Sequence, residues 1–185
     1  MYKYFKKLNY PICIKKKDLN MAKVIITQIG GANSELSAAL RYFSQKFSMP
    51  DDRGKALLND IATEEMGHLE MVSTMLSQLT KGATIDEIKE YGLDQYYADF
   101  GLGIFPTNAS GVPFTASYFY SSDDVLANLS DDMAAEEKAR ATYEYLINLA
   151  TDPDVIAPLL FLRQREIVHF NRFKELYDSY KKMLQ

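Results

Sequence analysis

The sequence predicts an all-α fold, a four-helix bundle built from two antiparallel helical hairpins joined by a long crossover. Four long segments have apolar residues at steps of three and four, the period of an amphipathic helix; they are residues 20–47, 53–80, 123–151 and 154–183. The connection within each pair is short, which favours antiparallel neighbours, whereas the segment 82–122 separates the pairs.

Turn and capping residues mark the ends of these helices, at 49–52, 81–82, 121–123 and 152–153. The crossover 82–122 is rich in Gly and Pro and contains one predicted short helix near Ile85–Tyr91. A single long crossover between two helical hairpins is the ferritin-like connectivity. We therefore expect a ferritin-like bundle that occupies residues 1–185 as one domain, a length near the usual domain size.

The remaining segments carry weaker expectations. Residues 1–19 should be extended and lie against the bundle or a neighbouring subunit. The segment Phe100–Tyr120 should form an ordered covering loop or, equally well, a subunit contact. The single cysteine, Cys13, should be a small buried apolar residue, with an intermolecular crosslink as the alternative.

Composition excludes several classes of protein. Hydrophobic residues form 47% and charged residues 25% of the chain, as in an ordinary globular protein. The net charge of −4 lacks the excess of basic residues typical of proteins that bind nucleic acid. No apolar run is long enough for a membrane span. Lys15, Lys16 and Lys17 interrupt the first apolar residues, so we expect synthesis in the cytoplasm without a signal peptide.

The two histidines of the chain each close the same pattern. A glutamate is followed thirty residues later by a second glutamate and three residues after that by a histidine; the two sets are Glu35, Glu65 and His68, and Glu136, Glu166 and His169. One Glu from each of two helices and a Glu-x-x-His from each of the other two form dinuclear metal sites in four-helix bundles.

Helical phase places these six residues inside. Each lies in an apolar stripe of its helix, whereas Glu70 and Glu137 share faces with polar residues and Glu64 is ambiguous. Buried carboxylates need compensating charge, and Arg140 is the one basic residue clearly on an inner stripe. Bound cations would supply the missing charge; the alternative is a core of ion-paired carboxylates with structural histidines.

The donor types narrow the choice of metal. Carboxylates with one imidazole per metal suit manganese or iron, and zinc is disfavoured because the chain has no Cys-rich or His-rich set. Ligand type alone does not choose between manganese and iron.

Four stretches resemble the manganese catalases, and more narrowly the short spore-coat branch of that family. They are Gly30-Gly-Ala-Asn-Ser-Glu35-Leu with Tyr42, Ala62-Thr-Glu-Glu65-Met-Gly-His68-Leu-Glu-Met71, Ala134-Ala-Glu136-Glu-Lys-Ala-Arg140 and Arg165-Glu166-Ile-Val-His169. The opening Lys7-Leu-Asn-Tyr-Pro11 and the crossover stretch Gly111-Val-Pro-Phe-Thr-Ala-Ser-Tyr118 add to the similarity.

The resemblance implies disproportionation of hydrogen peroxide to water and dioxygen at a centre of two manganese ions, with iron as the less favoured alternative. In the family pattern Glu35 is the bridging carboxylate, Glu65 and His68 bind one manganese, and Glu136 and His169 bind the other. Glu166 matches an outer-sphere carboxylate that carries protons. Tyr42 matches a tyrosine that hydrogen-bonds the bridging glutamate.

The same resemblance implies location in the spore coat, contact with other spore-coat proteins and assembly as a homo-oligomer. Two other functions remain open. One is a structural spore-coat protein with a retained but weakly active metal site. The other is a ferritin-like di-iron oxidase in which Glu166 is a true ligand.

Overall fold

The computed structural model describes residues 7–94 and 103–184, and the regular secondary structure of these residues is almost entirely helical. The elements are α1 (Leu19–Ile25), α2 (Thr27–Gly30), α3 (Glu35–Gln45), the 3-10 turn η1 (Lys46–Ser48), α4 (Asp52–Leu79), α5 (Ile85–Glu90), the 3-10 turn η2 (Ala116–Tyr118), α7 (Val125–Leu149) and α8 (Pro153–Met183). Within this described part, β structure is limited to one isolated bridge between Thr107 and Pro113. None of its helices is long and apolar enough to cross a membrane.

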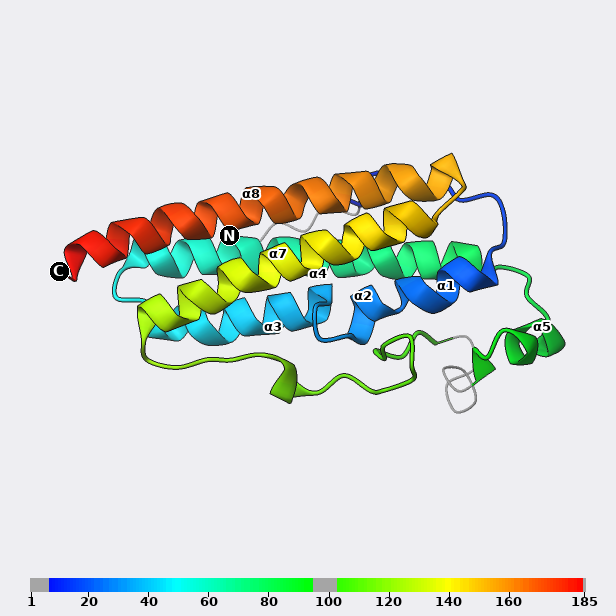
Figure 1. Ribbon diagram of the computed structural model, residues 1–185, viewed down its shortest axis with the longest axis horizontal. Coiled ribbons are helices and arrows are strands. Elements are labelled where there is room, and N and C mark those ends of the chain that lie inside the picture. Colours follow the sequence, from blue (N-terminus) through cyan, green and yellow to red (C-terminus); the bar gives the residue numbers. More distant parts are fainter. Residues whose placement is uncertain (1–6, 95–102, 185) are drawn as a thin grey trace.

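The long helices form two antiparallel hairpins, one of α3 with α4 and the other of α7 with α8 (Figure 1). Capping residues set their starts: the side chains of Asp51, Asp124 and Asp152 accept hydrogen bonds from the first turns of α4, α7 and α8. From residue 103 the crossover runs along the bundle to the start of α7 (Figure 1). The predicted all-α, ferritin-like architecture is thus confirmed.

The predicted helix 20–47 is wrong as a single element. The chain leaves helical geometry after Gly30, and α3 begins at Glu35 with Ser34 as its N-cap, whose side chain accepts from the amide of Ser37. The break follows from a glycine pair and a serine cap, which together favour a helix end and a new start. It places Glu35 in the first turn of α3, where the helix dipole favours a negative charge.

The break lets the crossover approach closely. A Cβ atom on Gly30 would lie 2.2 Å from the carbonyl carbon of Pro106, so only glycine fits against this backbone. Residues of the crossover are further held by hydrogen bonds from Ala109 N to Thr27 Oγ1 and from Arg41 Nη2 to Tyr118 O. The described part of the predicted loop is therefore ordered on the bundle; Phe100 and Gly101 lie outside the described residues.

Two apolar clusters form the core, one on each side of the middle of the bundle. One includes Val72 of α4 and Leu162 of α8. The other includes Leu58 of α4 and Phe173 of α8. The candidate metal ligands lie between these two clusters along the helices. Apolar side chains therefore pack on both sides of them along the bundle.

The N-terminal segment lies against the bundle, as predicted, from Lys7 onward; residues 1–6 are outside the described part. Tyr10 stacks on Phe161 of α8 with ring centroids 5.3 Å apart, and Ile14 N donates to Gln78 Oε1 of α4. The prediction that Cys13 is buried is wrong, because its thiol is exposed while its neighbour Ile14 is buried. In an extended segment alternate residues face opposite sides, so only one of these two can face the core.

Candidate metal centre

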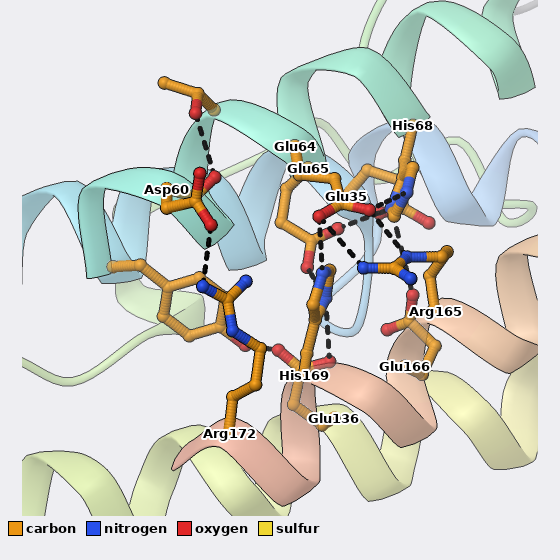
Figure 2. Close-up of polar contacts among 12 residues, drawn as sticks. Glu35, Asp60, Glu64, Glu65, His68, Glu136, Arg165, Glu166, His169 and Arg172 are labelled. Atoms are coloured by element: carbon orange, nitrogen blue, oxygen red, sulfur yellow. Dashed lines mark hydrogen bonds and ion pairs between the residues drawn. The ribbon is translucent and has the colours of Figure 1, made fainter. Parts of the chain in front are cut away.

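Four helices bring the six predicted residues together in the middle of the bundle (Figure 2). Glu35 comes from α3 and Glu136 from α7, while α4 and α8 each contribute a Glu-x-x-His pair. All six are at most 2% exposed. The exposed positions of Glu70 and Glu137 confirm that helical phase separated the inner glutamates from the outer ones.

The six side chains form two groups that share members. Ligand atoms of Glu35, Glu65, His68 and Glu166 lie within 4.8 Å of one another, and so do those of Glu65, Glu136, Glu166 and His169. Glu65 is central, because its two oxygens lie 2.8 Å from His68 Nδ1 and 2.7 Å from His169 Nδ1. Such an arrangement matches a carboxylate placed between two metal positions.

This geometry bears on two expected roles. Glu35 belongs to the His68 group alone, whereas Glu65 and Glu166 belong to both groups. The hydroxyl of Tyr42 donates to Glu136 and not, as expected, to Glu35. The donor to Glu35 is Tyr143 of α7, which the sequence pattern presents only as a core aromatic. Glu136 of α7 is thus held by a tyrosine of α3, and Glu35 of α3 is held by a tyrosine of α7.

Glu64, ambiguous in sequence, lies behind both histidines. Its oxygens are 3.5 Å from His68 Nε2 and 3.2 Å from His169 Nε2, and both also pair with the guanidinium of Arg165. Arg140 does not face the site as predicted, because its guanidinium pairs with the exposed Glu137. A long arginine can turn outward from a stripe when a carboxylate on the helix surface is within reach.

Burial and crowding of charge shift the pKa values of the carboxylates in the metal-free site. Burial, together with the negative charge of Glu65, raises the pKa of Glu35 to about 8. The pKa of Glu166 is raised well above its usual range by burial and by the charges of Glu65, Glu35 and Glu136. Burial also acts to raise the pKa of Glu65, but the charges of His169 and His68 prevail and lower it.

Protons therefore balance charge in the absence of metal. Burial alone would lower the pKa of His68 and of His169, but the charge of Glu65 and neighbouring carboxylates raises both. A site that retains protons on both imidazoles and on buried carboxylates can exchange those protons for cations.

The donors fit a pair of divalent ions. Several buried ligand atoms make no hydrogen bond within residues 7–94 and 103–184: Glu65 Oε1, Glu136 Oε2, Glu166 Oε1 and His169 Nδ1. Glu65 Oε1 and His169 Nδ1 are close, yet they lack hydrogen-bond geometry, as expected for atoms that converge on a common ion. Four carboxylates and two imidazoles suit manganese or iron.

A narrow cavity reaches the site between α3 and α7. Its volume is about 10 Å³, about enough for one water molecule, and its walls include the small residues Ala32, Ala38, Ala135 and Ala139. Glu136 and Glu166 are among the residues that line it. The cavity therefore brings small molecules against two of the six candidate residues.

Comparison with known proteins supports the helical-bundle fold. The family model described as "Manganese containing catalase" matches residues 1–183. The chain belongs to the manganese catalase family. It is 49% identical to "Protein CotJC" of Bacillus subtilis (strain 168) over 181 residues, covering 98% of this chain and 95% of that protein. It is 31% identical to a "Manganese catalase" of Bacillus subtilis, covering 94% of this chain and 68% of that protein.

A solved structure of the same family has the same fold. The crystal structure of wild-type KatB, "a manganese catalase from Anabaena", superposes with a TM-score of 0.89 at 36% identity and covers 98% of this chain and 82% of that one. Over nearly its whole length, the chain therefore has the same fold as a solved manganese catalase.

Proposed function

We propose that this chain is a dimanganese catalase that converts hydrogen peroxide to water and dioxygen. The observation that carries the proposal is the pair of buried four-residue groups that share Glu65 and Glu166, in a chain of the manganese catalase family. Glu35 and His68 would bind one ion, Glu136 and His169 the other, and Glu65 both. When bound, two manganese ions supply the exchange of electrons in pairs that peroxide chemistry needs.

Glu166 would carry protons rather than bind metal. Its Oε1 is 4.0 Å from His68 Nδ1, longer than the approach of Glu65, and it lines the access cavity. Its raised pKa suits a carboxyl group that would hold a proton beside the site and pass it to a peroxide oxygen. Tyr42 would fix the orientation of Glu136 by its hydrogen bond.

The access cavity suits hydrogen peroxide as substrate. A cavity with about the volume of one water molecule and several alanines in its wall favours a small molecule such as hydrogen peroxide over an organic peroxide. We propose location in the spore coat from the 49% identity to Protein CotJC and the resemblance to the spore-coat branch. Contacts with other coat proteins and a homo-oligomeric state remain predictions.

A structural coat protein with little turnover is the second candidate, because the printed name of Protein CotJC states no enzymatic activity. An oxygen electrode separates the two. Manganese-loaded protein should release dioxygen from peroxide, and replacement of both Glu65 and His68 by alanine should abolish the release. Dioxygen release that survives this double substitution would overturn the proposed catalase site, and manganese-loaded protein inert to peroxide would favour the structural role.

A further inference from the structure

Glu64 and Arg165 lie next to the two histidines (Figure 2), with Glu64 beside the Nε2 atoms and Glu65 beside the Nδ1 atoms. Arg165 Nε is 2.6 Å from Glu64 Oε1 and its Nη2 is 3.2 Å from Glu64 Oε2, so the pair is bidentate. Glu64 is 22% and Arg165 27% exposed. The pair therefore sits at the border between the buried site and solvent, and joins α4 to α8.

Each oxygen of Glu64 faces a different histidine. Oε1 lies 3.5 Å from His68 Nε2 and Oε2 lies 3.2 Å from His169 Nε2. Neither Nε2 makes a hydrogen bond in the described part of the chain, and Glu64 places a carboxylate oxygen within 3.5 Å of each. Both Nδ1 atoms point the other way, toward Glu65.

An imidazole that binds metal must leave one nitrogen free of hydrogen and place its remaining N–H on a partner. A carboxylate accepts from two donors at once, and a guanidinium on its two oxygens prevents it from turning. Glu64 can therefore set the same tautomer in both rings, although they belong to different helices.

We propose that Glu64, clamped by Arg165, is a positioning residue that orients both histidines with Nδ1 toward the metal ions. The proposal rests on the proposed metal site. Because Glu64 faces both rings, its replacement should weaken the binding of both metal ions. A residue that positions only one histidine should weaken the binding of one ion alone.

The chain offers a matched control. Asp60 of α4 pairs with Arg172 of α8, with Nη2 2.7 Å from Oδ2, one turn before Glu64 (Figure 2). This pair also joins α4 to α8, and no contact of it with either histidine is recorded among the described residues. Asp60→Asn thus removes an ion pair between the same helices without touching the imidazoles.

The test is a titration of metal-free protein with Mn²⁺ in competition with a chelator, for the unsubstituted chain, Glu64→Gln, Arg165→Gln and Asp60→Asn. Glutamine keeps the size of Glu64, but its amide group offers an N–H where one imidazole needs an acceptor. Glu64→Gln should lower the affinity of both binding steps about 10-fold to 100-fold, as loss of such partners does elsewhere. Arg165→Gln should give a smaller loss, because the carboxylate remains but can turn.

The control should change affinity by less than about threefold, since exposed ion pairs contribute little. Thermal unfolding of the metal-free proteins shows whether each variant is folded. If Glu64→Gln does not fold, the comparison of Arg165→Gln with Asp60→Asn tests the proposal instead. Unchanged affinity in Glu64→Gln, or an equal loss in Asp60→Asn, would overturn the positioning role. An unsubstituted chain that binds no Mn²⁺ would instead contradict the proposed function.

Discussion

Two tyrosines act as matching supports at the scale of single residues. Tyr42 of α3 donates to Glu136 of α7, and Tyr143 of α7 donates to Glu35 of α3. Both rings are fully buried, so neither carboxylate can replace the lost donor with bulk water. The orientation of the two outer carboxylates therefore depends on these hydroxyls.

Replacing either tyrosine by phenylalanine should lower stability by about 1–3 kcal/mol, because it leaves a buried carboxylate oxygen without its donor. Peroxide turnover should fall as well. Urea unfolding and an oxygen electrode measure the two effects. Tyr145→Phe is the control, since that ring is 68% exposed. Similar effects at Tyr145 and Tyr143 would contradict the supporting role.

Asp132 offers a test of pH dependence outside the ligand set. It is fully buried, and burial raises its pKa well above the usual range despite the nearby Arg41. A carboxyl with a raised folded-state pKa contributes stability that is complete below the unfolded pKa, near 3.8, and is lost as pH rises toward the folded pKa. The native protein should lose part of its stability as the pH rises from about 4 upward for this reason.

Asp132→Asn should remove this component, because asparagine resembles the protonated acid and does not ionise. Melting temperatures of the two metal-free proteins across this pH range provide the measurement. The variant should gain relative stability as pH rises. A constant difference at all pH values would show that Asp132 does not titrate in this way.

At the scale of elements, the break between α2 and α3 organises the site and the crossover together. Gly30 contacts the backbone of Pro106 and Thr107, and four residues later Ser34 starts the helix that carries Glu35. Displacing the crossover should therefore disturb the position of Glu35.

Gly30→Ala should destabilise the protein by about 1–3 kcal/mol, because its Cβ would overlap the backbone of Pro106 and force a shift. Gly67→Ala is the control, since there a Cβ meets only the amide end of Asn9 at 3.1 Å and helix propensity favours alanine. Urea unfolding compares the two. A smaller loss in Gly30→Ala than in Gly67→Ala would be inconsistent with this account.

Helices α4, α7 and α8 could be predicted from sequence because apolar period and capping residues agree along each of them. The break after Gly30 was missed because the apolar stripe continues in phase from Ile29 to Glu35 and Tyr42. Gly30-Gly31 and the capping pair Ser34 and Ser37 were the available signal. The family resemblance indicated Tyr42 as a support of a glutamate ligand, but Tyr143 could not be predicted, since a tyrosine that supports a ligand and one that fills the core share the same stripe.

At the scale of the whole molecule, the metal centre lies between two apolar clusters, and these should hold the bundle together without metal. Metal should still add stability, because it binds the folded state alone. At a free Mn²⁺ concentration of about 100 times Kd the gain is about 2.7 kcal/mol.

Removal of metal with a chelator should therefore lower the melting temperature while the helical circular dichroism signal persists. A matched sample with Mg²⁺ in place of Mn²⁺ controls for a general effect of divalent ions. Loss of helical signal on chelation would show that the clusters alone do not maintain the fold.

The central claim is that two buried groups sharing Glu65 form one dimanganese site for peroxide. Elemental analysis of the purified protein, combined with an oxygen electrode on the same sample, tests it most directly. The account predicts about two manganese ions per chain, as for other two-metal carboxylate sites in such bundles, and one dioxygen released for every two peroxides consumed. Iron in place of manganese, or manganese-loaded protein that releases no dioxygen, would contradict it.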